Sequence, residues 1–267
     1  MRDFLIVCLG EVRKQRKNYF NSWSNYFSLL LWPILTFITT YYTYSSFDLS
    51  VLAPFQLQTQ GRFLTFLVTG SLGYNCFWAM VQGAWQIENE RQNGTLEIAF
   101  LTPGSRMAMM YGRSLGGFIH NVWMFACFAV IVILLNSMIT LQTVFAVLGA
   151  MVILLVASTV WGGFMTSLFI VTRDSNFLFT VCDEPMNFFS GVKIPVEAFP
   201  LWAQAISAIF PSTYCIYIIR AIFLGNAVNG GKAAELIFSM LFMIAATYVI
   251  LRCAEKRNRE TGNLQFY

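Results

Sequence analysis

Charged residues are scarce in this chain of 267 residues. Asp, Glu, Lys and Arg together make up 11% of it, whereas 57% is hydrophobic. Soluble domains carry roughly 25% charged residues, so the composition excludes an ordinary soluble domain. Several apolar runs reach the ~20 residues that a helix needs to cross the hydrocarbon core of a bilayer. The composition therefore predicts an all-α polytopic membrane protein.

Side chains that carry catalysis or bind metals are also few. His120 is the only histidine, and the six cysteines show no metal-ligand spacing. The glycine-rich stretch at 225–234 lacks the GxxxxGK[ST] spacing of a phosphate-binding loop, because Asn226 occupies the first glycine position and Ala233 follows the lysine. We therefore expect no catalytic residue, no metal site and no ATP site in this chain. The same scarcity weighs against a membrane-embedded acyl- or glycosyltransferase.

Hydropathy and breaks in the apolar runs divide the chain into six expected transmembrane helices within a single domain, 1–267. They cover residues 23–44, 63–86, 111–135, 141–171, 175–192 and 233–252. The apolar but proline-broken segment 193–230 predicts short external, re-entrant helices before the last span. Most of the 17 basic residues fall in segments that would share one side. The positive-inside rule then places both termini and the tail, 253–267, in the cytoplasm.

The first 22 residues combine an apolar stripe with a basic end. Phe4, Cys8 and Val12 recur every four residues, with Leu5 and Leu9 beside them, and four basic residues follow. This spacing is typical of an amphipathic helix that lies on the membrane surface. A plain basic flank of the first span is the alternative. We expect a cytoplasmic interface helix over residues 1–22.

The loop at 88–107 holds the densest mixture of charges in the chain. Glu88, Glu90 and Arg91 are predicted to form a solvated extension of the second span. Asn93 and Gly94 are residues that end helices, so the extension should stop there. The loop is expected on the cytoplasmic side.

A short separate helix is expected next in this loop. Thr95 can cap its start, and Ser105 can cap the following span. The helix, 96–101, is too apolar for a freely solvated loop, so it needs lipid headgroups or another protein as a partner. Its apolar residues are Leu96, Ile98, Phe100 and Leu101.

Asp183 and Glu184 fall near the middle of the fifth expected span. Carboxylates inside a membrane are costly and normally face a bundle interior or a water-filled cavity. They predict a cation-attracting site in a translocation path. Two alternatives stay open: the pair lies near an interface because the span starts later, or it pairs with Arg113 or Arg173.

Two motifs resemble a known family. Glu90-Arg91-x-x-Gly94-Thr95-Leu96-Glu97 with Leu101-Thr102-Pro103-x-Ser105 is similar to the coupling-helix signature of ABC-2 type permeases, the membrane subunits of ABC exporters. Ser190-Gly191-Val192-x-x-Pro195, Phe199-Pro200-x-Trp202, Pro211-x-Thr213-Tyr214 and Arg220 are similar to that family's re-entrant external segment. The resemblance covers nearly the whole chain.

The resemblance implies a division of labour between subunits. Two permease copies and two separate ATP-binding subunits would form the unit, with ATP and magnesium bound in the partner chain. Contact with that subunit would involve Glu90, Arg91, Gly94, Thr95, Leu96, Glu97, Phe100, Leu101 and Pro103. The external motif would comprise Ser190, Gly191, Pro195, Pro200, Pro211 and Tyr214.

The expected function is therefore that of a transport subunit rather than an enzyme, in the bacterial inner membrane, in contact with lipids and with no nucleic acid. The aromatic content and the acidic pair favour an amphipathic substrate: a drug, an antimicrobial peptide or a lipid-like molecule. One alternative is export of a lipid-linked glycan, polysaccharide or lipo-oligosaccharide. A more distant alternative is an ion-coupled secondary transporter.

Overall fold

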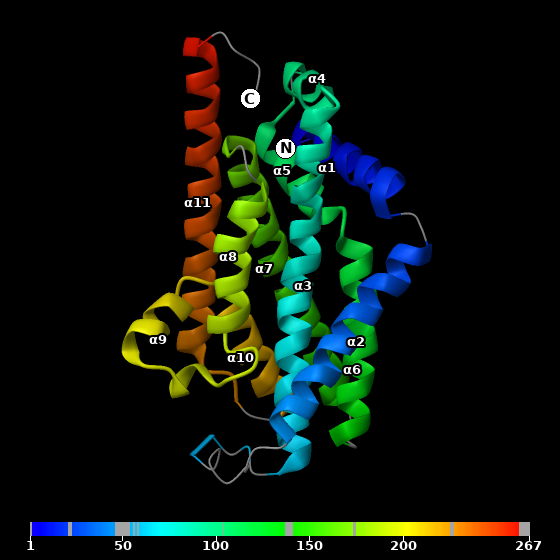
Figure 1. The fold of residues 1–267 in the computed structure, drawn as a ribbon, viewed down its shortest axis with the longest axis vertical. Coiled ribbons are helices and arrows are strands. Elements are labelled where there is room, and N and C mark those ends of the chain that lie inside the picture. Colours follow the sequence, from blue (N-terminus) through cyan, green and yellow to red (C-terminus); the bar gives the residue numbers. More distant parts are fainter. Residues whose placement is uncertain are drawn as a thin grey trace.

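The computed structural model is helical, with no strand among the residues that it describes (Figure 1). These are residues 2–20, 23–45, 54–55, 57, 59–102, 104–136, 141–172, 175–224 and 227–261. The main elements are α1 (Arg2–Gln15), the π-helical turn η1 (Arg16–Phe20), α2 (Trp23–Ser45), α3 (Gln60–Gln92), α4 (Thr95–Leu101), α5 (Arg106–Leu115), α6 (Phe118–Asn136), α7 (Leu141–Val171), α8 (Ser175–Phe189), the 3₁₀ turn η3 (Val196–Ala198), α9 (Leu201–Ser207), α10 (Pro211–Phe223) and α11 (Gly230–Thr261).

The long helices form one elongated bundle with two distinct ends (Figure 1). At one end lie α1, α4 and the last turns of α11, and we call it the α4 end. The start of α3 lies at the other, and α9 and α10 lie toward it; we call it the α9 end. The loop expected to be cytoplasmic and the segment expected to be external therefore lie toward opposite ends.

Helices occupy all six expected span ranges. Among the described residues α3, α7 and α11 are long and apolar enough to cross a membrane, and a fourth span results if the bent pair α9–α10 is counted as one. By contrast, α8 has 15 residues and contains Asp183, Glu184 and Pro185. The six-span topology thus stays a prediction.

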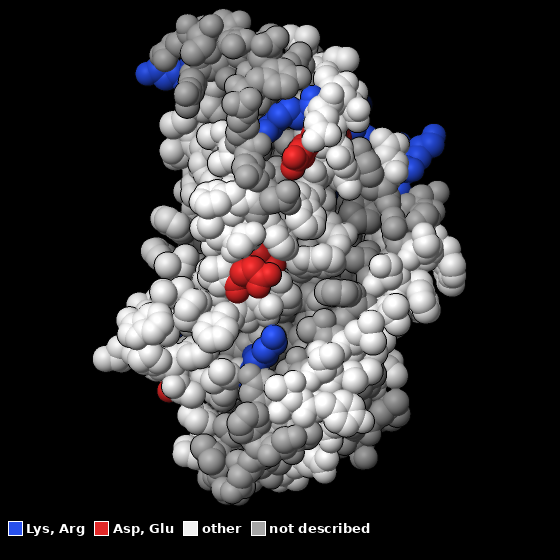
Figure 2. Space-filling view, viewed as in Figure 1, with Lys and Arg blue, Asp and Glu red and all other residues white. Residues whose placement is uncertain are grey.

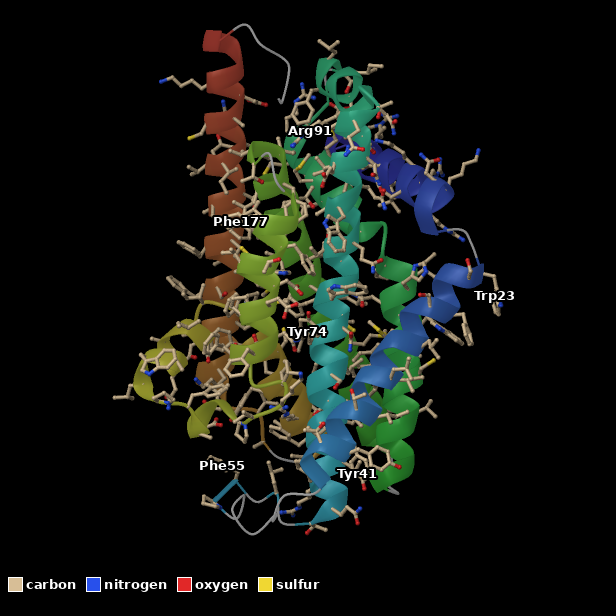
Figure 3. All side chains as sticks on the ribbon, viewed as in Figure 1. Trp23, Tyr41, Phe55, Tyr74, Arg91 and Phe177 are labelled. Atoms are coloured by element: carbon tan, nitrogen blue, oxygen red, sulfur yellow. The ribbon has the colours of Figure 1, made fainter. Side chains whose placement is uncertain are left out.

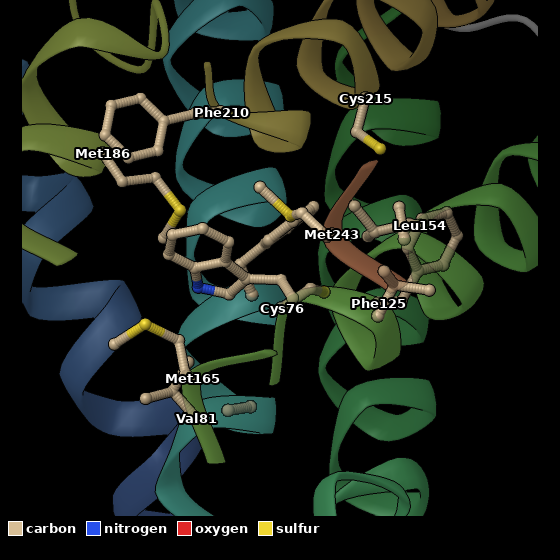
Figure 4. Close-up of a cluster of buried hydrophobic side chains, with 14 of the residues drawn as sticks. Cys76, Val81, Phe125, Leu154, Met165, Met186, Phe210, Cys215 and Met243 are labelled. Atoms are coloured by element: carbon tan, nitrogen blue, oxygen red, sulfur yellow. The ribbon is translucent and has the colours of Figure 1, made fainter. Parts of the chain in front are cut away.

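The core of the bundle lies where α7 packs against α3 (Figure 4). Cys76 and Met80 of α3 and Met165 of α7 are fully buried. A Cβ atom at Gly162 would lie 2.9 Å from the carbonyl oxygen of Met80, so only glycine allows α7 to approach α3 this closely. Trp161 fills the space beside Phe210, with ring centroids 5.9 Å apart. Side chains therefore fill the interior between these helices.

The expected N-terminal helix is present, but its protein-facing side differs from the expected one. α1 buries Cys8, Glu11 and Gln15, whereas Leu5 and Leu9 are exposed. The polar side of α1 therefore packs against the protein, and its apolar ridge is left for another surface.

Gly112 of α5 and Gly116, directly after its last residue, determine how α1 packs. A Cβ at Gly112 would lie 2.8 Å from the Cys8 carbonyl oxygen, and one at Gly116 would lie 2.7 Å from the Gln15 Cβ. Glycines four residues apart lie on one face of a helix, and they let α1 approach the α5 backbone. This close packing brings Glu11 against α5.

The third expected span, 111–135, is not one helix. α5 ends at Leu115 and α6 begins at Phe118, with turns at Gly116 and Gly117. A Cβ at Gly117 would lie 3.0 Å from the Ala79 carbonyl oxygen of α3. The prediction of one continuous helix over 111–135 is therefore wrong. The two adjacent glycines at 116 and 117 mark the position of the break in the sequence.

At the other chain end, α11 does not stop at residue 252 but continues to Thr261. The expected cytoplasmic tail therefore begins as a helix. At the α9 end, α9 and α10 are bent by 91° relative to each other. Short broken helices are what the sequence predicts for this segment.

The glycine packing of α1 against α5 is testable by alanine substitution. Gly112→Ala should lower the free energy of unfolding by about 1–3 kcal/mol, the usual cost of overpacking. The control is Gly10→Ala, because a Cβ atom added at Gly10 would meet no heavy atom within 4 Å. Gly10→Ala should instead raise the free energy of unfolding by roughly 0.5–1 kcal/mol, because alanine has a higher helix propensity than glycine. Melting temperatures in detergent measure both, and equal stability of the two variants would contradict the packing described.

Candidate functional site

The short helix α4 is separated from α3 by a sharp turn. Gly94 has φ +67°, in the left-handed region that favours glycine, and directly precedes α4. Its N–H donates to the Arg91 carbonyl oxygen at 3.0 Å. Thr95 is the first helical residue and not the predicted cap; its hydroxyl donates to the Glu90 carbonyl oxygen at 3.2 Å. α4 is therefore a separate helix that stays bonded to the end of α3.

Arg106 holds the other end of α4. Its Nη1 donates to the Thr102 carbonyl oxygen at 3.0 Å, and its Nη2 donates to that of Phe100. A cation at a helix C-terminus pairs with carbonyls that have no partner within the helix. Arg106 also lies 3.7 Å from the Glu255 carboxylate of α11. Ser105 caps α5 as predicted, accepting from the Ala108 N–H.

Arg91 joins α3 to the C-terminus of α7 (Figure 3). Its Nη2 donates to the Phe169 carbonyl oxygen at 2.8 Å, and its Nη1 donates to that of Thr172 at 3.1 Å. The guanidinium thus supplies hydrogen bonds that the last turn of α7 cannot make within the helix. The position where α3 leads into α4 is therefore fixed to α7.

A group of four charges, three of them buried, joins α1, α3 and α5, and we call it the charge cluster: Glu11, Lys14, Glu90 and Arg113. Glu90 lies 2.5 Å from Arg113 Nη2 and 2.7 Å from Lys14 Nζ. Glu11 lies 3.1 Å from Arg113 Nε and 3.4 Å from Lys14 Nζ. Arg113 has no exposed side-chain surface, and Glu90 is 3% exposed. Two carboxylates balance two cations.

Burial of the charge cluster corrects one expectation. Glu90 does not belong to a solvated extension of α3, because it faces α1 and α5. Sequence reasoning places Lys14 in the basic end of the expected interface helix and does not single out Glu11. The sequence signal for this cluster is that Glu11 and Lys14 lie one helical turn apart, beside the Cys8 stripe. Arg113, one of the partners considered for Asp183, pairs with Glu11 and Glu90 instead.

The apolar side chains of α4 face in two directions. Leu96 is completely buried in the core, and Phe100 is half-buried with the Arg106 guanidinium 5.0 Å from its ring centroid. Ile98 and Leu101 are 65% and 68% exposed. The outer surface of α4 is therefore formed in part by Ile98 and Leu101, which we call the α4 ridge. The Glu97 side chain and Pro103 lie outside the described residues.

Asp183 and Glu184 lie half-way along α8, where Figure 2 shows an acidic patch surrounded mostly by uncharged surface. Asp183 is fully buried, and the Tyr74 hydroxyl of α3 donates to its Oδ2 at 2.5 Å (Figure 3). Its Oδ1 is buried and has no hydrogen-bond partner among the described residues. Glu184 is partly exposed. Arg173, the other partner considered, lies outside the described residues.

The residues of the predicted external motif organise the broken helices at the α9 end. Gly191 has φ +78°, which turns the chain after α8. Ser190 and Ser212 share a hydrogen bond of 2.7 Å, and the Tyr214 hydroxyl donates to the Ala208 carbonyl oxygen at 2.9 Å. The prolines stand at helix starts: Pro195 before η3, Pro200 before α9, and Pro211 as the first residue of α10.

One family model matches the sequence of this chain. It is that of the ABC-2 type transporter, and it aligns with residues 9–224, more than half of the chain. The matched region runs from α1 through α10 and includes α4, the charge cluster, the acidic pair and the external motif. No match was found among curated proteins. The chain therefore belongs to the ABC-2 type transporter family and is a membrane permease of an ABC transporter.

Proposed function

We propose that this permease exports an amphipathic molecule, driven by a separate ATP-binding subunit that docks on α4. In this proposal the α4 end faces the cytoplasm of a bacterial cell and the α9 end faces outward. Two permease copies and two ATP-binding subunits form the unit, and ATP and magnesium bind in the partner. The observation that carries the proposal is the α4 ridge, an apolar surface on a helix fixed at both ends.

The anchoring of α4 supports a mechanical role. A force on the α4 ridge would pass through the Thr95–Glu90 hydrogen bond to α3 and through Arg106 to α11. It would also reach α7, because Arg91 bonds the last carbonyls of that helix. A loosely attached loop would absorb such a movement. The described contacts would transmit it to the long helices.

The charge cluster supports the same role for α1. Glu90, next to the α4 junction, forms ion pairs with Lys14 of α1 and Arg113 of α5. Removal of one partner from a buried ion pair leaves an uncompensated charge, so α1, α3 and α5 should move as one body. We propose that α1 lies on the inner membrane surface with Leu5 and Leu9 toward lipid.

We favour a path between two copies over a path through one. The interior between α3 and α7 is filled by side chains, as described above. The acidic patch, by contrast, reaches the surface through Glu184. We propose that a second copy covers this face and that the acidic pair lines the path. Glu184, with the buried Asp183 beside it, then supplies negative charge for a cationic group of the substrate.

The first prediction concerns the α4 ridge. Ile98→Glu combined with Leu101→Glu places two charges on the docking surface and should reduce transport-coupled ATPase activity about tenfold or more, because desolvated apolar anchors dominate interface energies. Proteoliposomes containing both subunits provide the measurement. The control, Ile98→Leu with Leu101→Ile, keeps the surface apolar and should remain active. Normal transport by the doubly charged variant would refute the docking surface.

The second prediction concerns the charge cluster. Glu90→Gln should lower the free energy of unfolding by about 3 kcal/mol, because Arg113 and Lys14 lose a buried counter-charge. Glu88→Gln, two residues earlier in α3, should stay within about 0.5 kcal/mol, as most substitutions outside such networks do. Thermal melting in detergent measures both. If Glu90→Gln and Glu88→Gln have the same melting temperature, the cluster does not stabilise this end of the bundle.

The third prediction concerns the path. Asp183→Asn with Glu184→Gln removes the negative charge and should slow ATP-dependent transport of a lipophilic cation such as tetraphenylphosphonium about tenfold. An uncharged aromatic analogue should keep its rate, which provides the control. Unchanged transport and substrate-stimulated ATPase activity in the double variant would eliminate the path role. Transport that continued without ATP but stopped when the proton gradient collapsed would instead indicate an ion-coupled transporter.

A further inference from the structure

A pocket of about 380 Å³ lies at the α9 end, apart from α4, the charge cluster and the acidic pair. Its volume falls within the ~300–1,000 Å³ of small-molecule sites. Residues from α3, α10, α11 and η3 line it, together with Phe55 and Leu57 from the segment before α3. None of the roles assigned above uses its interior.

Arg220 is the central charged group of this pocket. Its Nη2 donates to the carbonyl oxygens of Phe66 and Val192, each at 3.1 Å. Its guanidinium carbon lies 3.5 Å from the Phe66 ring centroid. Gly70 makes room for this arrangement, because a Cβ there would lie 2.7 Å from Nη2. The guanidinium is thus held in one position while it borders the pocket.

The charge of Arg220 is only partly compensated. Among the described residues no carboxylate forms an ion pair with it. Its buried Nε finds no hydrogen-bond partner among them either. Carbonyl oxygens and an aromatic face stabilise a cation less completely than an anion does. A cation removed from water in this way favours binding of an anion in the adjoining space.

The pocket lining holds two cations, Arg220 and Lys232, and one carboxylate, and a second carboxylate, Glu235, lies beside Lys232. Lys232 lines it, with its Nζ 5.7 Å from the Tyr214 ring centroid and 2.9 Å from the Glu235 carboxylate. That pair is exposed, so it holds Lys232 weakly and the ammonium can turn toward a ligand. Glu197 is the one carboxylate among the lining residues, against two cations.

The remaining wall is suited to hydrocarbon. Phe55, Leu57 and Leu224 contribute apolar surface, and the Tyr217 side chain lies among the lining residues. A ligand that fits both the charged wall and the apolar wall carries an anionic group with several oxygens and a hydrocarbon part. The planar guanidinium fork is well matched to phosphate oxygens.

We propose that this pocket binds an anionic phospholipid of the outer leaflet, with its phosphate on Arg220 and Lys232 and its chains along the apolar wall. Such a lipid would connect the start of α3 to α10 and η3. The proposal depends on the α9 end lying in the membrane's outer half. It does not depend on the transported substrate or on the α4 ridge, so its failure would leave the proposed export function intact.

The test measures binding of dihexanoyl-phosphatidylglycerol to the purified full-length protein by calorimetry. Lys232→Gln should weaken binding about fivefold, and Glu197→Gln, which removes the opposing charge, should tighten it about threefold, as expected for charges at a partly exposed site. Lys17→Gln removes one exposed positive charge at the α4 end and should leave binding unchanged. Weaker lipid binding by Lys232→Gln together with tighter binding by Glu197→Gln would support the proposal.

Three results would overturn the proposal. One is equal binding to all variants, including Lys17→Gln. The second is equal binding of uncharged dihexanoyl-glycerol. The third is full occupation by inorganic phosphate alone, which would identify a free-phosphate site. Arg220→Lys separates binding from structure: it keeps the charge but loses the fork. If it lowers the melting temperature without changing lipid affinity, Arg220 only clamps the backbone.

Discussion

The charge cluster is the interaction on which the α4 end of this protein depends. Glu11, Glu90 and Arg113 are buried between three helices with Lys14 half-buried beside them, and an unpaired charge among the buried groups would cost several kcal/mol. The cluster therefore fixes α1, α3 and α5 in one relative arrangement. Gly112 of α5 is a condition for it, because a side chain there would push Glu11 away from Arg113. Close backbone approach and charge pairing thus support each other.

The contacts at both ends of α4 explain how this short helix can present an apolar ridge without collapsing onto the bundle. Leu96 points into the core and the helix ends are bonded, so α4 cannot rotate to bury Ile98 and Leu101. In water that exposure has an unfavourable free energy of roughly 25 cal/mol per Å² of apolar surface. The surrounding contacts hold α4 in place against this tendency. A surface kept exposed in this way is suited to a partner that covers it.

Much of the architecture could be predicted from the sequence because hydropathy and helix breakers act locally. The expected span ranges, the Asn93-Gly94 break, and the broken helices before α11 all have helical or turn counterparts in the structure. What could not be predicted are partners across the bundle. Glu90 looked solvated because its partners, Lys14 and Arg113, are far away in sequence. Tyr74 gave no indication of its bond to Asp183, which is 109 positions away. Gly116 and Gly117 are visible in the sequence, but the expected span, 111–135, runs through them.

Three arginines, Arg91, Arg106 and Arg220, share one physical task, and this links the two ends of the bundle. Arg91 bonds the last carbonyls of α7, Arg106 those of α4, and Arg220 that of Val192 in the turn after α8. A bundle made of broken helices in a membrane has unsatisfied carbonyls at every break, and water is not available to all of them. An arginine can donate to two or three carbonyls while keeping its charge, which lysine does with less geometric control. At the α4 end Glu255 lies within ion-pair range of Arg106. At the α9 end Arg220 has no such carboxylate among the described residues, and there the bundle leaves a pocket instead.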